Sequence, residues 1–159
     1  MTHRRLLRFM RIAAFAAALA LPSARSLASC QIGSVSAVAF GSYDVYSATA
    51  NAGVGWFSVS NCNSSSRTYT ASLSKDSVNN SFSPRIMLNS SNQQLQYNLY
   101  KDLPHTQILG DGNSSSFTIV NTNSGSGTGP THNIYGLIPA GQDAAVGTYS
   151  DSITITIRF

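Results

Sequence analysis

The sequence contains no glutamate, and charged residues make up only 10% of its 159 residues. Strong helix formers are scarce, whereas Ser, Thr, Asn and Gly are abundant and β-branched and aromatic residues are common. This composition argues against a helical protein and favours an all-β domain, because β-branched and aromatic side chains suit a pleated, half-buried surface.

No apolar run is long enough to span a bilayer, which takes about 20 residues. The longest run, residues 12–21, follows an arginine-rich start and precedes small residues at Ala24, Ser26 and Ala28. This layout predicts a secretory signal peptide over residues 1–28, cleaved after Ala28 or alternatively after Ala20. An N-terminal membrane anchor is the competing interpretation. Residues 29–159 are then expected to form a single domain.

The basic character of the chain belongs to the predicted leader. The whole chain has ten basic and six acidic residues, but five of the basic ones lie within residues 1–28, so residues 29–159 carry 5 − 6 = −1. No basic patch is left for nucleic acid or an anionic lipid surface. We therefore expect neither nucleic-acid binding nor membrane insertion of the mature chain.

Cys30 and Cys62 are the only cysteines. In an exported protein such a pair predicts one disulfide, and closing this loop would stabilise the fold by roughly 3–4 kcal/mol on the chain-entropy model. A free thiol or a metal pair is the alternative, although no histidine or further cysteine lies close in sequence to either residue.

Short strands separated by turn signals fill residues 29–159, which predicts a β-sandwich or barrel. The last strand is the clearest, because Ile153, Ile155, Ile157 and Phe159 alternate with polar residues as in a strand with one buried face. A chain that ends on such a strand can take its next partner strand from another molecule. The other expected strands cover residues 32–40, 54–59, 68–73, 85–88, 95–100, 117–120 and 132–138, with a Gly/Ser/Thr-rich loop over residues 121–130.

No catalytic or cofactor-binding motif is present. There is no G-x-S-x-G elbow and no P-loop, and His105 and His132 are not spaced as metal ligands. Asp111 and Asp151 could form the carboxylate pair of a glycosidase, but Asp111 is better explained as a turn residue and Asp151 by local backbone hydrogen bonding. We predict a protein that is not an enzyme and has no cofactor and no metal.

Several segments follow one another in a recognisable order: residues 40–43 (Phe-Gly-Ser-Tyr), 59–62, 95–102, 135–142 (Tyr-Gly-Leu-Ile-Pro-Ala-Gly-Gln) and 147–153, ending in the terminal Phe159. Together they resemble the spore coat protein U domain family, the secreted pilus subunits of archaic chaperone–usher systems. The resemblance covers essentially all of residues 29–159.

The resemblance implies an immunoglobulin-like β-sandwich that lacks its final strand. In such a family a periplasmic chaperone lends a strand first, and a neighbouring pilus subunit replaces it during assembly at an outer-membrane usher. The expected strand-binding surface is then Ile153, Ile155, Ile157 and Phe159, and the expected location is the cell surface, reached through the periplasm, or the medium. The alternative is that these four are core residues of a complete sandwich.

Polymerising subunits of this kind carry an alternating apolar donor segment before the first cysteine, and this chain departs from that pattern. Cleavage after Ala28 leaves only Ser29 there, and cleavage after Ala20 leaves residues 21–29, which contain Pro22 and Arg25. We therefore expect a tip or minor subunit, with a role in adhesion or biofilm formation. The alternative function is a self-contained secreted sandwich that acts as a coat component or a carbohydrate-binding module.

Overall fold

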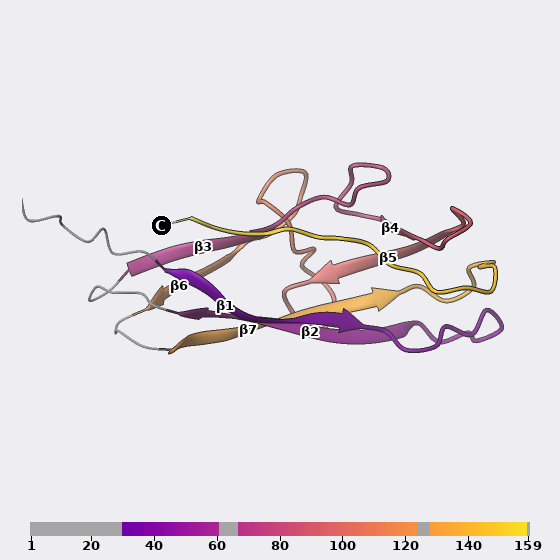
Figure 1. Cartoon of the computed structure of the whole chain (residues 1–159), viewed down its shortest axis with the longest axis horizontal. Coiled ribbons are helices and arrows are strands. Elements are labelled where there is room, and N and C mark those ends of the chain that lie inside the picture. The colour runs from indigo at the N-terminus through magenta and orange to yellow at the C-terminus, as the bar shows by residue number, and fades with distance from the viewer. Residues whose placement is uncertain (1–29, 61–66, 124–127, 159) are drawn as a thin grey trace, which may run out of the picture.

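The computed structural model describes residues 30–60, 67–123 and 128–158, which form strands and no helix. A five-stranded sheet has the order β1-β2-β7-β5-β4, and a three-stranded sheet has the order β6-β3-β8. Figure 1 shows β2 and β7 in one layer and β3 in the other. The strands are β1 (Gln31–Ala39), β2 (Asn51–Ser60), β3 (Arg67–Leu73), β4 (Arg85–Leu88), β5 (Gln94–Tyr100), β6 (Ile119–Asn123), β7 (Thr128–Ile138) and β8 (Ile155–Arg158).

All strand pairs in both sheets are antiparallel, and the chain crosses repeatedly from one sheet to the other. The predicted all-β, immunoglobulin-like sandwich is thereby confirmed. Among the described residues, no helix has the length and hydropathy needed to cross a bilayer. The predicted signal peptide and both of its cleavage sites lie outside the described residues.

Alternation of side chains along β2 explains how the core is built. Phe57 and Val59 are fully buried, whereas Val54 and Trp56 remain 51% and 37% exposed on the outer face. Gly55 lies on the inner face, where a Cβ atom would come within 2.7 Å of the backbone oxygen of Ser36. Glycine is therefore required at position 55 for β1 to approach β2 so closely.

The strand boundaries differ from the prediction at several places, and β2, for example, begins at Asn51 rather than at residue 54. The expected loop over residues 121–130 is wrong, because β6 continues to Asn123 and β7 begins at Thr128. Polar residues suffice there, since Thr122 pairs with Thr68 in the β3–β6 ladder and the two hydroxyls lie 2.8 Å apart. The strand expected at residues 117–120 instead spans Ile119–Asn123, because its pairing with β3 extends to Asn123. The last strand is shorter than expected and begins at Ile155.

A buried cation supports the sheet junction. Arg85 is fully buried, and its guanidinium donates hydrogen bonds to the carbonyl oxygens of Phe82, Ser74 and Leu109. Burial lowers the pKa of Arg85, while nearby Tyr97 and the carboxylates of Asp76 and Asp151 act in the opposite direction. The three carbonyl contacts stabilise the buried charge and fix the positions of three chain segments around it.

Candidate functional site

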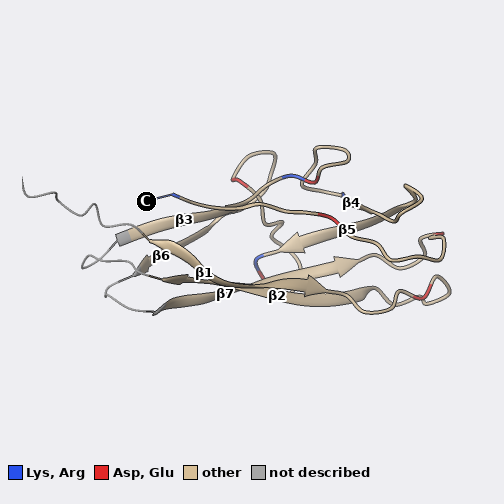
Figure 2. Ribbon diagram, viewed as in Figure 1, with Lys and Arg blue, Asp and Glu red and all other residues tan. Residues whose placement is uncertain are grey.

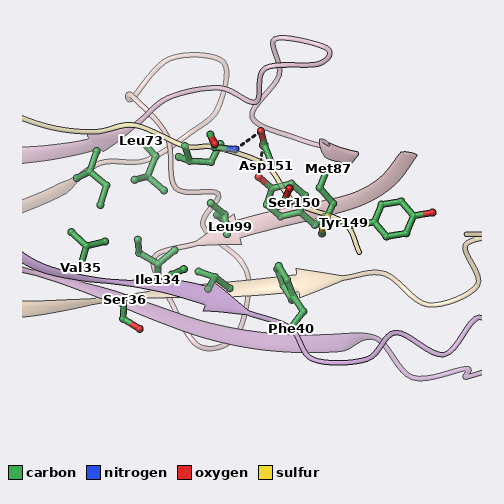
Figure 3. Close-up of a pocket in the computed structure, with 16 residues that line it drawn as sticks. Val35, Ser36, Phe40, Leu73, Met87, Leu99, Ile134, Tyr149, Ser150 and Asp151 are labelled. Carbon is green, nitrogen blue, oxygen red and sulfur yellow. Dashed lines mark hydrogen bonds between the residues drawn. The ribbon is translucent and has the colours of Figure 1, made fainter. Parts of the chain in front are cut away.

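Two strands that flank the same side of the sandwich each have a single partner among the described residues. β1 lies at the edge of the five-stranded sheet and pairs with β2, and β8 lies at the edge of the three-stranded sheet and pairs with β3. A cavity of about 600 Å³ lies between β1 and the chain that leads into β8. We call this cavity the edge groove (Figure 3).

The edge groove has two walls and a floor. Residues 35–38 and Phe40 form the β1 wall, and residues 149–153 with Ile155 form the C-terminal wall. The floor consists of core side chains from the other strands: Leu73, Met87, Tyr97, Leu99 and Ile134. Figure 3 shows Leu99 and Ile134 between the two walls. Asp151 is the one charged residue among these lining residues, and β1, β2 and β7 carry no Lys, Arg, Asp or Glu (Figure 2).

Burial distinguishes the groove walls from the central strands. The inward side chains of the central strands are sealed, as the 0% exposure of Phe57 and 4% exposure of Leu99 show. On the walls, by contrast, Val35 is 56% exposed, and Ile153 and Ile155 are only half-buried although they pack against the core. Apolar side chains of the walls therefore lie on the inner face of the sandwich but stay partly exposed.

The predicted site residues are distributed unevenly around the groove. Ile153 and Ile155 line it, and Ile157 packs half-buried against the core outside the lining. Phe159 lies outside the described residues, as does Cys62. Cys30 is buried at 6% exposure, and the β1–β2 register pairs its neighbour Gln31 with Ser60. That register brings the start of β1 beside the chain that leads to Cys62, and the disulfide stays a prediction.

Sequence reasoning missed the β1 wall. The interval from Val35 to Val38 is three residues rather than two, which breaks the strand alternation. In the structure this break is a register shift between Ser36 and Ala39, which lets Val35 and Val38 both line the groove. The irregular spacing in the sequence was the available signal.

Asp151 has more partners than the local backbone contact that the sequence predicts. Its carboxylate accepts a hydrogen bond from the amide of Ser152 at 2.7 Å, as expected, but also from the Tyr97 hydroxyl at 2.6 Å and the Ser77 hydroxyl at 3.2 Å. Burial is the main cause that raises the pKa of Tyr97 far above its usual value, and the hydrogen bond from its hydroxyl to Asp151 acts in the same direction. The phenol therefore keeps its proton and acts as the donor at any physiological pH.

Asp111 is a turn residue, as predicted. Its carboxylate accepts a hydrogen bond from the amide of Asn113 at 2.9 Å, and that bond is the main cause of its lowered pKa. Within the described ranges, no group of three His, Cys, Asp or Glu side chains comes together to hold a metal ion. Apart from Asp151 the groove is lined by uncharged and mostly apolar residues beside two edge strands, which suits it to contact with apolar side chains and with backbone groups along strand edges.

Comparison with solved structures identifies a similar chain in the CsuC–CsuE chaperone–tip adhesion subunit pre-assembly complex from the archaic chaperone–usher Csu pili of Acinetobacter baumannii. The two chains are 19% identical with a TM-score of 0.45, and the alignment covers 82% of this chain. This chain spans 40% of the length of that one. Comparison with curated proteins gives no match.

The family model of the Spore Coat Protein U domain matches residues 14–156. The match includes both walls and the floor of the edge groove and every described strand except the last residues of β8. The chain belongs to the Spore Coat Protein U domain family.

Proposed function

We propose that this protein is a non-enzymatic structural subunit of an archaic chaperone–usher pilus and that its edge groove accepts a β-strand from a partner. The partner is first a periplasmic chaperone and then a neighbouring subunit, after transfer at the outer-membrane usher. In this proposal residues 29–159 are the mature domain, exported to the cell surface. Membership of the spore coat protein U domain family supports the assignment.

The edge groove is the observation that carries the proposal. Within the part of the chain that the structure describes, β8 pairs on one side only, with β3, so a strand laid along its other side would extend the three-stranded sheet. Alternate side chains of that strand would enter the groove and cover Val35, Ile153 and Ile155. Each buried backbone group left without a hydrogen bond costs about 1–3 kcal/mol, so filling the groove should contribute substantially to the stability of the domain.

The test is production of the chain in a bacterial periplasm with and without a matched archaic-type chaperone. We expect soluble, protease-resistant protein only in a one-to-one complex with the chaperone, because a strand must cover the groove. A stable and protease-resistant monomer made without the chaperone would contradict the proposal. That outcome would favour the alternative, a self-contained secreted sandwich acting as a coat component or carbohydrate-binding module.

The position in the fibre is a finer part of the proposal. Residues 21–29 contain Pro22 and lack apolar alternation, so they are poorly suited to act as a donor strand. We assign the protein to the tip or to a minor position, with a role in adhesion or biofilm formation. N-terminal sequencing of the protein from a pilus fraction tests this, and a mature N-terminus well ahead of Leu21, which would leave a longer donor segment before Cys30, would contradict it.

A further inference from the structure

The C-terminal wall of the edge groove is a crossing between the two sheets. Ser150 exchanges two backbone hydrogen bonds with Leu88 of β4, at 3.0 and 3.1 Å, so the wall begins on the five-stranded sheet. Thr154 is bonded to Ser74 beyond the end of β3, at 2.9 and 3.0 Å, so the wall ends on the three-stranded sheet. Between these points no strand ladder holds the chain, and the wall depends on side-chain contacts.

Tyr97 joins the two walls across the floor. It lies on the inner face of β5 with 4% of its surface exposed. Its ring packs edge-to-face on Phe40 of the β1 wall, with ring centroids 5.9 Å apart at 72°. Its hydroxyl donates to the Asp151 carboxylate of the C-terminal wall at 2.6 Å (Figure 3). One rigid side chain therefore contacts both walls and spans the distance between them.

Arg85 supports the same wall from beneath. Its guanidinium donates to the carbonyl oxygen of Ser74 at 3.1 Å, and Ser74 is the residue that bonds Thr154. The positive charge of Arg85 also lies close enough to Asp151 and Tyr97 to interact with both. The carboxylate is thereby held in place on the wall from the side of the core.

We propose that Tyr97, through its hydrogen bond to Asp151 and its ring contact with Phe40, is the positioning residue that sets the width of the edge groove. The inference rests on the proposed function, since it says that Tyr97 affects how tightly the groove binds a partner strand. The Tyr97 hydroxyl holds the C-terminal wall at the distance from the β1 wall that a bound strand needs. Less conformational freedom is then lost when a strand binds. Loss of the hydroxyl should leave the lining apolar but the wall free to shift.

The test compares Tyr97→Phe with Tyr69→Phe. Tyr69 is a matched control, because it is also buried (1% exposed), its hydroxyl also makes a 2.6 Å bond, to His132, and it does not line the groove. The probe is a fluorescein-labelled synthetic peptide of about ten residues in which valine and threonine alternate, long enough for one strand. Each protein is purified with its chaperone, the chaperone is displaced by excess peptide, and peptide release is followed by anisotropy.

We expect both substitutions to lower the melting temperature, but only Tyr97→Phe to release the peptide faster, by about tenfold, as expected for a lost hydrogen bond to a charged group. Equal release rates for Tyr97→Phe and wild type, or equal acceleration by both variants, would overturn the inference. Wild-type protein that retains no peptide would instead overturn the proposed function and the inference together.

A second pair of variants separates the hydrogen bond from the charge. Asp151→Asn keeps an acceptor oxygen for the Tyr97 hydroxyl, and Asp151→Ala removes it. Peptide release from Asp151→Asn should be closer to that of wild type than release from Asp151→Ala. Equal release from the two variants would mean that the charge beside Arg85, not the phenol bond, holds the wall, and would overturn the inference.

Discussion

At the scale of single residues, the partly buried side chain of His132 makes the stability of the protein depend on pH, which hydrophobic packing alone does not. His132 lies between two aromatic side chains, with its Nε2 2.6 Å from the Tyr69 hydroxyl and its ring centroid 5.1 Å from that of Phe57. Burial lowers the pKa of His132 below its ordinary value. The folded protein therefore favours the neutral imidazole more strongly than the unfolded chain does.

This difference predicts a loss of stability in acid. Because the folded-state pKa is the lower one, the contribution of His132 is complete above the unfolded value of about 6.5 and is lost as the pH falls below it. The wild-type melting temperature should fall more between pH 7 and pH 5 than that of His132→Gln. His105→Gln serves as the control for removing an imidazole, and parallel profiles for wild type and His132→Gln would contradict the prediction.

At the scale of elements, the irregular β1 and the short β8 are the parts that create the groove. A regular β1 would stay paired along all of β2, whereas the observed register shifts let residues 35–38 and Phe40 line the cavity. β8 is shortened because residues 151–154 cross between the sheets instead of joining a ladder. Both departures leave apolar side chains uncovered at the edges of the sheets.

Adjacent residues of β1 allow a matched test of the groove. Val35 lines it and is 56% exposed, whereas Ser34 is exposed and does not line it. Val35→Asp should reduce recovery of the chaperone complex at least about tenfold, because a bound strand would bury an unpaired carboxylate. Ser34→Asp should leave recovery near the wild-type level, as measured by co-purification from the periplasm. Similar recovery of both variants would argue that no strand covers Val35.

At the scale of the whole molecule, the sandwich closes around a single core that contains side chains from both sheets. Phe57 and Leu99 of the five-stranded sheet meet Tyr69 and Leu73 of the three-stranded sheet in that core. The predicted Cys30–Cys62 disulfide would act on the unfolded chain as a whole, by restricting the loop that it closes. Its contribution therefore adds to that of the core without requiring any change in packing.

Replacement of both cysteines by serine should lower the free energy of unfolding by roughly 3 kcal/mol on the chain-entropy model. The measurement is denaturant unfolding of the chaperone-free protein with its groove filled by the alternating peptide. Wild-type protein under reducing conditions is the matched comparison and should approach the stability of the double variant. Wild-type stability that is insensitive to reductant would mean that the bridge does not form.

The sequence alone determined the fold class and placed Ile153 and Ile155, two of the residues of the C-terminal wall, on the inner face of a strand. The alternation of Ile153, Ile155 and Ile157 with polar residues marks an inner face on local grounds, because strand periodicity depends only on neighbouring side chains. Turn chemistry at Asp111 is equally local. The polar ends of β6 and β7 were missed because backbone pairing with distant strands, not the residues themselves, holds them in the sheets.

Only the tertiary structure decided where the two edge strands lie relative to one another. The groove joins residues 35–38 and Phe40 to residues 149–153 and Ile155, which are more than a hundred positions apart, and no local pattern specifies such a contact. The same holds for Tyr97, whose ring and hydroxyl contact Phe40 and Asp151 from a third strand. Strand periodicity is set by near neighbours in the chain, whereas the width of a groove is set by packing between segments that meet only on folding.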